Sequence, residues 1–225
     1  MATENAILAS LRRRLPEVLP NLQVVPERPR AKAPGDLVLR VRMAGAPWRL
    51  VCEVKSVGEP RYLAQAITTL TLAVRQAPRH YPVVVAPYIG PEGQRLCQAA
   101  GVGYLDLAGN AYLRFDGVLV DRHSGAPPPR ARARLRRLFA PRASRLHRAL
   151  LEQPRVTWTL ARLAREAGVS LRTAHLVINA LEEKAFVDKR RGAIALTKPA
   201  ELLELWAQHY RLAAHRQLER TDHAA

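Results

Sequence analysis

Cysteine and long apolar runs are both scarce in this chain. Its only two cysteines, Cys52 and Cys97, each lie in an apolar stretch, and no zinc-ligand spacing occurs. The sequence favours two buried thiols of a reducing cytoplasm over a disulfide or a metal pair. No run of 18 apolar residues exists, and the start (Met-Ala-Thr-Glu-Asn) lacks the pattern of a signal peptide. The sequence predicts a folded cytoplasmic protein that has no membrane partner.

Acidic residues are also few. The chain has 19 Asp and Glu against 36 Lys and Arg, which gives a net charge of +17. Residues 1–121 hold 15 basic and 10 acidic side chains, whereas residues 122–225 hold 21 and 9. Most of the basic residues are Arg, whose planar guanidinium suits bidentate phosphate contacts. A charge this positive attracts polyanions and indicates nucleic-acid binding that depends steeply on salt.

Two carboxylates and a lysine are expected at neighbouring strand ends. Asp36 begins a strand over residues 35–43, and Glu53-Val54-Lys55 end a strand over residues 48–55. Because side chains alternate faces along a strand, Glu53 and Lys55 point the same way. Such a group can hold a hard divalent cation beside a phosphate and stabilise the charge that develops during attack.

The order of elements around this group resembles the core of the PD-(D/E)XK nuclease superfamily. The patterns predict a helix at 6–15, strands at 22–25, 35–43 and 48–55, a helix at 61–76 and a buried strand at 82–87. The resemblance covers roughly residues 5–90 and implies a restriction-endonuclease-like α/β domain, a mixed sheet flanked by helices. It implies that Asp36, Glu53 and the Val54 carbonyl hold Mg²⁺ or Mn²⁺, and that Lys55 orients the attacking water. Gln65 stands where several members place a glutamine that lines the site.

Two features qualify this resemblance. Gly35 precedes Asp36 where the superfamily often has proline. The same residues also allow a structural interpretation, with Asp36 as a strand-entry residue and Glu53 and Lys55 as an exposed pair that protects an edge strand. The match in element order favours the nuclease-like interpretation.

Sequence patterns and composition predict how the rest of the chain is divided into domains. Further α/β elements are expected up to residue 121, with hairpin turns at Gly109-Asn110 and Asp116-Gly117. The sequence thus predicts a nuclease-like domain at 1–122, a basic Pro/Arg linker at 123–142, a winged helix-turn-helix domain at 143–198 and a C-terminal helix at 199–225. The five arginines within 130–137 are interpreted as a solvated stretch or as a phosphate-tracking segment, with no preference.

The second domain resembles the α+β winged helix-turn-helix of DNA-binding proteins. Thr159 is a good N-cap for a helix that ends at Gly168, and Ser170 is an N-cap for the next helix. A pair of short strands about a basic tip, residues 188–196, then predicts the wing. The resemblance implies that the second helix enters the major groove of double-stranded DNA. The residues expected to contact DNA are Ser170, Leu171, Arg172, Thr173, His175, Asn179, Lys189, Arg190 and Arg191.

Within that set the expected roles differ. Arg172 is expected to read guanine and Asn179 adenine, and Ser170 with the helix N-terminus to meet a phosphate. Arg190 and Arg191 are expected on the phosphate backbone. A winged helix that serves protein contacts is the alternative.

The whole chain resembles AbiEi-type antitoxins and related winged-helix transcriptional regulators. Three segments carry this resemblance: Glu53–Ser56, Gly103–Tyr112 and Leu202–Ala207. Two functions therefore stay open. One is a metal-dependent DNA endonuclease that a winged helix targets; the other is a non-cleaving, antitoxin-like repressor with a retired nuclease-like domain. The apolar face of the C-terminal helix (Leu202, Leu203, Leu205, Trp206 and Tyr210) further predicts a homodimer.

Overall fold

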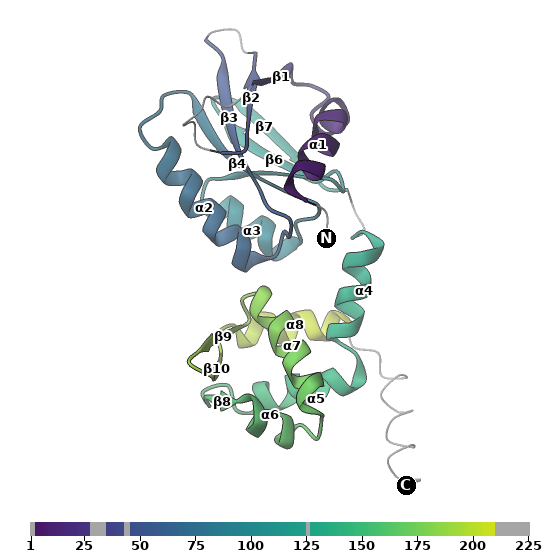
Figure 1. Ribbon diagram of the computed structural model, residues 1–225. Coiled ribbons are helices and arrows are strands. Elements are labelled where there is room, and N and C mark those ends of the chain that lie inside the picture. Colours follow the sequence, from purple (N-terminus) through teal and green to yellow (C-terminus); the bar gives the residue numbers. More distant parts are fainter. Residues whose placement is uncertain (1–2, 28–34, 43–45, 125–126, 210–225) are drawn as a thin grey trace. The chain divides into compact units, whose positions relative to one another are not determined.

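A seven-stranded sheet organises residues 1–128, the first of two units into which the chain divides (Figure 1). The structure is a computed structural model, and it describes residues 3–27, 35–42, 46–124 and 127–209. Strands β1 to β7 lie in the sheet in chain order. The elements of this unit are α1 (Glu4–Val18), β1 (Val24–Glu27), β2 (Leu37–Val41), β3 (Trp48–Val54), α2 (Pro60–Val74), β4 (His80–Ala86), α3 (Pro91–Ala99), β5 (Gly103–Asp106), β6 (Ala111–Phe115) and β7 (Val118–Arg122).

The type of strand pairing changes twice across this sheet. Strands β1, β2 and β3 pair antiparallel, β3, β4 and β5 pair parallel, and β5, β6 and β7 pair antiparallel again. The parallel pairs need crossover connections, which α2 and α3 supply. The carboxyl ends of β3, β4 and β5 therefore meet at one edge, together with the start of β2.

Helices cover both faces of the sheet. On α1, residues Ile7, Leu11, Leu15 and Val18 recur at helical spacing and are buried against one face with Leu37, Cys52 and Val54. On α2, residues Leu63, Ala66, Ile67 and Leu70 are buried against the other face with Val51 and Val84. Successive β3 residues thus enter opposite cores, as strand alternation requires. Figure 1 shows α2 and α3 on one side of the sheet and α1 on the other.

Residues 129–225 form the second unit, a small helical domain with a three-stranded antiparallel sheet of order β8-β10-β9. Its core includes Leu146, Trp158, Leu163, Ile178 and Leu202. Its elements are α4 (Pro129–Leu138), α5 (Pro141–Glu152), β8 (Trp158–Thr159), α6 (Leu160–Glu166), α7 (Leu171–Glu183), β9 (Val187–Arg190), β10 (Ala193–Leu196) and α8 (Pro199–His209).

The predicted mixed α/β class is confirmed: a mixed sheet with flanking helices precedes a small antiparallel sheet with helices. The segment predicted as a linker, 123–142, differs from that description. It contains α4 and the start of α5, and the boundary between the two units falls after Pro128. The physical reason is that Leu138 and Phe139 are buried in the core of the second unit, so the arginine-rich segment is anchored there.

Two further expectations can be compared with the structure. Cys52 and Cys97 are buried free thiols, as predicted, and burial raises the pKa of both, that of Cys97 to about 12. Among the residues described, no helix combines the length and the apolar character that crossing a bilayer demands.

Candidate active site and candidate DNA-binding surface

The sheet brings Asp36, Glu53 and Lys55 to one strand end. Residue Leu37 of β2 stands opposite Cys52 of β3, and the Asp36 N–H donates to the Cys52 carbonyl at 2.8 Å. The next position in this register therefore sets Asp36 opposite Glu53. Both share the face of the sheet that carries Val51, which is the face that α2 covers. The predicted convergence of the three side chains at neighbouring strand ends agrees with this geometry.

Contacts within the group are close. Lys55 Nζ lies 2.8 Å from Glu53 Oε1, and the two side chains are 23% and 18% exposed. Asp36 is more exposed, and its Oδ2 accepts the Val54 N–H at 2.8 Å. Each carboxylate keeps a second oxygen, Asp36 Oδ1 and Glu53 Oε2, that can face a cation.

This donor set fits magnesium. Mg²⁺ is usually held by one or two carboxylates, with water and substrate phosphate completing its octahedron. In the part of the chain that the structure describes, no three His, Cys, Asp or Glu side chains gather as a metal-binding group. A cation here would depend on Asp36, Glu53, the Val54 carbonyl and the phosphate itself. Glutamine Gln65 is exposed on α2, whose buried side is formed by Leu63, Ala66, Ile67 and Leu70, so it points to solvent.

Gly35 is required where it stands, and proline could not replace it. Its φ is +88°, and a Cβ there would lie 2.8 Å from the Cys52 carbonyl oxygen. Proline is restricted to a φ near −65°, so it cannot adopt this conformation. Glycine at this position is therefore a consequence of how this chain enters β2 and places Asp36.

A buried carboxylate that the sequence patterns did not single out closes the same end of the sheet. Asp106, fully buried at the end of β5, accepts the N–H of Ile89 at 3.0 Å and the N–H and side-chain amide of Asn110 at 2.9 and 2.7 Å. Burial raises the pKa of Asp106, while these hydrogen bonds act in the opposite direction. Its role is to hold the β4–α3 loop against the β5–β6 turn. The sequence feature that could have indicated this carboxylate is an aspartate at a strand end, Asp106, four residues before the turn residue Asn110.

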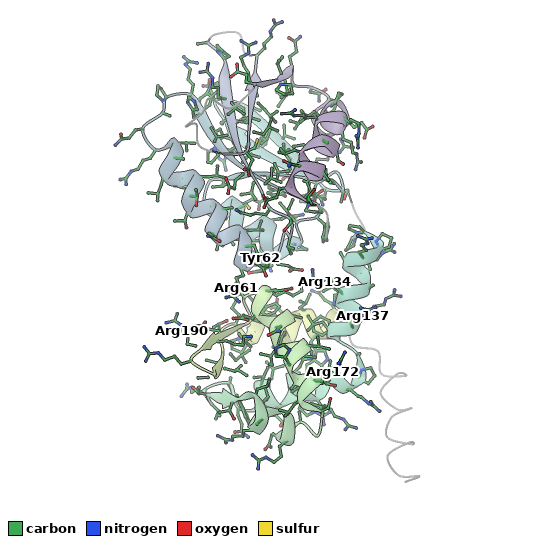
Figure 2. The ribbon with its side chains drawn as sticks, in the orientation of Figure 1. Arg61, Tyr62, Arg134, Arg137, Arg172 and Arg190 are labelled. Carbon is green, nitrogen blue, oxygen red and sulfur yellow. The ribbon has the colours of Figure 1, made fainter. Side chains whose placement is uncertain are left out.

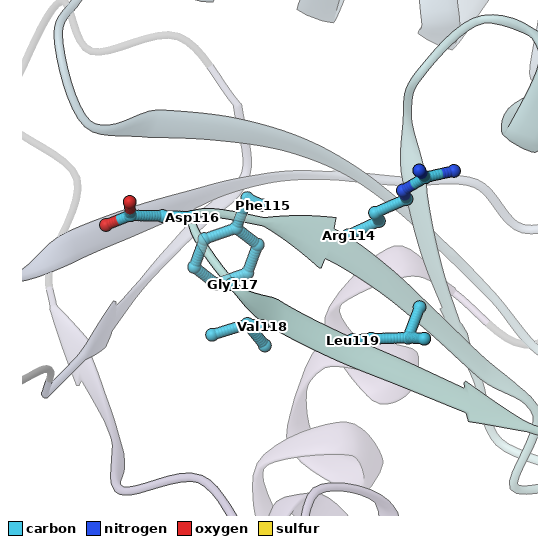
Figure 3. Close-up of a pocket in the computed structure, with 6 residues that line it drawn as sticks. All are labelled: Arg114, Phe115, Asp116, Gly117, Val118 and Leu119. Atoms are coloured by element: carbon cyan, nitrogen blue, oxygen red, sulfur yellow. The ribbon is translucent and has the colours of Figure 1, made fainter.

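The hollow in Figure 3 is a separate feature. It is lined by Arg114, Phe115, Asp116, Gly117, Val118 and Leu119 of the β6–β7 hairpin. Asp116 accepts the Trp48 indole N–H at 2.7 Å, and Trp48 begins β3. The hollow is thus at the end of the sheet opposite Glu53 and Lys55, and it is not part of the candidate active site.

Helices α6 and α7 lie where the sequence predicts a helix-turn-helix. Thr159 and Ser170 cap them, since Thr159 Oγ1 accepts the Arg162 N–H and Ser170 Oγ accepts the Thr173 N–H. Gly168 in the turn has a φ of +59°. On α7 the side chains of Leu171, Arg172 and His175 are exposed, and Ala174, Val177, Ile178 and Leu181 are buried. Ser170 uses its hydroxyl as the cap, so a phosphate at this helix would be met by backbone N–H groups.

The β9–β10 hairpin, which stands where the sequence predicts a wing, has a basic tip. Arg190 stands opposite Ala193, and Arg191 and Gly192 form the turn with φ of +50° and +81°, which is typical of a two-residue type I′ hairpin. Arg190 is 86% exposed and pairs with Asp188 at 2.7 Å. Figure 2 labels Arg190 on the wing and Arg172 on α7.

Lys189 and Asn179 contact each other across the domain. Lys189 Nζ donates to Asn179 Oδ1 at 2.6 Å and lies 2.9 Å from Glu182. The side-chain nitrogen of Asn179 lies 3.3 Å from a ring nitrogen of His175. The amide predicted to read adenine is thus oriented by a lysine from the wing strand, a contact between residues ten positions apart that spacing alone did not indicate.

Comparison of this chain with protein-family models, with curated proteins and with solved structures gives no match. Its function has to follow from the geometry and the chemistry of these residues.

Proposed function

We propose that this chain is a cytoplasmic protein that binds double-stranded DNA through its second unit and hydrolyses phosphodiester bonds, with Mg²⁺ or Mn²⁺, through its first. The observation that carries the catalytic proposal is the convergence of Asp36, Glu53 and Lys55 on one face at adjoining strand ends. The strand order β1-β2-β3-β4, with α2 crossing between the parallel pair β3 and β4, agrees with a restriction-endonuclease-like core.

In this proposal the residues of the first unit have distinct roles. Asp36 and Glu53 hold the cation, which supplies Lewis-acid stabilisation of the phosphate and a more acidic bound water. Lys55 orients the attacking water and neutralises charge that develops on the phosphate, an interaction that matters most in the transition state. Gln65 is exposed on α2, so an assisting role for it would require a substrate that reaches that helix.

DNA binding is supported by the surface of the second unit. The face of α7 that offers Leu171, Arg172, Thr173, His175 and Asn179 follows a capped helix-turn-helix, and the wing adds Arg190 and Arg191. Arg172 can form a bidentate pair with guanine, which is worth about 1–3 kcal/mol of discrimination. The wing arginines set affinity and salt dependence, because they would contact phosphate.

A second candidate function, a non-cleaving repressor, has an observation of its own in its favour. Lys55 is already paired with Glu53, and Asp36 already accepts the Val54 N–H, so each of these side chains has one polar partner without a cation. Such a group could serve as structure alone, as it would in a retired nuclease domain. DNA binding is common to both functions.

An assay of DNA cleavage by the parent and matched variants distinguishes the nuclease from the repressor. Supercoiled and branched DNA would be incubated with Mg²⁺ or Mn²⁺ and the parent, Asp36→Asn, Glu53→Gln or Lys55→Ala. We expect each variant to lose about 100-fold or more in cleavage rate while DNA binding persists, since loss of one electrostatic donor typically costs that much. Asp121→Asn, an exposed aspartate on β7 remote from β3 in the strand order, is the control.

DNA binding is measured separately from cleavage. The parent and Arg172→Ala with Arg190→Ala would be compared in mobility shifts and footprints at physiological salt, without divalent metal. A parent that footprints a specific site but nicks none of these substrates rules out the nuclease and leaves the repressor. A double variant that binds as tightly as the parent shows that α7 and the wing are not the DNA-binding surface.

A further inference from the structure

Helix α4 contains five arginines and no acidic residue, unlike α1 and α3, on which arginines pair with acids of the same helix. On α1, Arg14 pairs with Glu17 at 3.2 Å, and on α3, Arg95 pairs with Glu92 at 2.6 Å. No Asp or Glu occurs in the sequence between Asp121 and Glu152. Five exposed arginines therefore share α4 without an acid among them: Arg130, Arg132, Arg134, Arg136 and Arg137.

Helical geometry sorts these arginines into two rows. At 3.6 residues per turn, positions three and four apart share a side of a helix. One row holds Arg130, Arg134 and Arg137, and the other holds Arg132 and Arg136. Between them runs an apolar strip of half-buried or buried residues, Ala131, Leu135 and Leu138, of which Leu135 and Leu138 pack on the core of the second unit.

An ion pair shows which row lies beside the recognition helix. Arg134 forms an ion pair with Glu183, the last residue of α7. The row of Arg130, Arg134 and Arg137 is therefore on the side of α4 that faces the C-terminal end of α7, and Arg132 with Arg136 lies on the other side. Figure 2 labels Arg134 and Arg137 on α4. Because α4 belongs to the same unit as α7, this placement is part of one packed domain.

A polyanion would reduce the charge repulsion among the arginines of this row. Like charges three and four residues apart on a helix repel one another and destabilise it. A duplex carries one phosphate for every 3.4 Å of each strand, so it can neutralise several such cations at once while releasing condensed counterions. We infer that Arg130, Arg134 and Arg137 contact the phosphate backbone beside the groove that α7 enters, which extends the DNA-binding surface onto α4. This inference rests on the proposed DNA binding by α7.

The two rows provide a matched pair of variants in the full-length chain. Arg130→Gln with Arg137→Gln removes two charges from the α7-side row and keeps the Arg134–Glu183 pair; Arg132→Gln with Arg136→Gln removes two from the opposite row. Affinity for a mixed-sequence duplex of about 30 base pairs, roughly three helical turns, would be measured from low to physiological salt without divalent metal. Thermal unfolding of both variants would verify that the second unit is intact.

We expect the first double variant to reduce the slope of log K against log salt by about 1.8, since each phosphate contact contributes about 0.9. The second should leave the slope within about 0.5 of the parent, less than one contact. Equal changes in both variants, or no change in the first, would overturn the inference while leaving DNA binding by α7 in place. A parent that binds no duplex would instead refute the proposed function, and the α4 contact with it.

Discussion

His147 is a histidine enclosed in the core of the second unit. Its side chain is fully buried on α5, between the rings of Phe139 and Trp206 at centroid distances of 5.1 and 5.9 Å. Neither ring nitrogen has a hydrogen-bond partner among the described residues. Burial therefore favours the neutral imidazole and lowers the pKa of His147 to about 3.

This burial predicts a pH dependence of stability. In the unfolded chain His147 binds a proton below about pH 6.5, but in the folded chain it does so only below about 3. Between those values the unfolded state holds more protons, so the free energy of unfolding falls by about 1.4 kcal/mol for each unit of decreasing pH. Urea unfolding from pH 7 to 4 in a Trp48→Phe background would report the second unit through Trp158 and Trp206. His147→Phe should flatten the profile; equal slopes in variant and parent would contradict the assignment.

Gly35 offers a second test at a single residue. Its positive φ would cost another residue about 1–3 kcal/mol, and a Cβ there would also meet the Cys52 carbonyl at 2.8 Å. We expect Gly35→Ala to lower the free energy of unfolding of the first unit more than Gly117→Ala does. Gly117 has a similar φ of +78°, but nothing lies within 4 Å of its Cβ position. Denaturant titration compares the two, and an equal loss would show that the close approach to Cys52 has no effect.

At the scale of elements, α7, the helix proposed to enter the major groove, depends on its cap as well as on its apolar side. Ser170 Oγ accepts the Thr173 N–H at 3.2 Å, which satisfies one of the N–H groups that a helix start leaves unpaired. The hydroxyl stands at the end of α7 that is proposed to approach phosphate. Stability of the helix and DNA binding can therefore be separated by the choice of capping residue.

Two substitutions make that separation. Ser170→Ala should lower the free energy of unfolding of the second unit by about 1 kcal/mol, because the cap is lost. Ser170→Asp should retain stability, since aspartate is a good N-cap and its negative charge interacts favourably with the positive end of the helix dipole. The same charge should weaken duplex binding because it repels phosphate. Thermal unfolding and mobility shifts measure the two effects. An Asp variant that binds DNA as well as the parent would place phosphate away from this helix end.

At the scale of the whole molecule, the apolar face of α8 is largely used within the second unit. Leu202 is buried, Leu205 and Trp206 pack on the same core, and the Trp206 indole N–H donates to Ser144 Oγ at 3.1 Å. Leu203 stays 53% exposed, while Tyr210 lies outside the described residues. The surface available on α8 for a second copy is thus narrower than the sequence pattern suggested.

The homodimer remains a prediction, with Leu203 as the residue that tests it. A two-fold dimer would match two half-sites on DNA. The exposed Leu203 on α8 offers an apolar contact for the second copy. Light scattering at micromolar concentration should give twice the chain mass of 25.1 kDa. Leu203→Glu should shift the protein toward monomer, and Glu204→Gln on the same helix is the control. A parent that is monomeric under these conditions would contradict the prediction.

Local sequence determined most of the elements, because their causes are local. Nearly continuous apolar runs specified β2 and β3, helical spacing specified α2 and α7, and Thr159 and Ser170 capped the helices where hydroxyls were expected. The spacing of Glu53 and Lys55 was enough to set both on one face of β3. The arginine-rich α4 was missed because its stability comes from Leu138 and Phe139 in a core that the local pattern does not reveal.

Only the tertiary structure decided which distant residues meet. Strand register set Asp36 beside Glu53, and the close approach of Cys52 explains why glycine precedes Asp36. The contact of Lys189 with Asn179 and the hydrogen bond from Trp206 to Ser144 likewise join segments whose sequence patterns carry no information about each other. The physical reason is that hydrogen bonds and packing depend on separation in space, whereas a sequence pattern reports only the face of its own helix or strand.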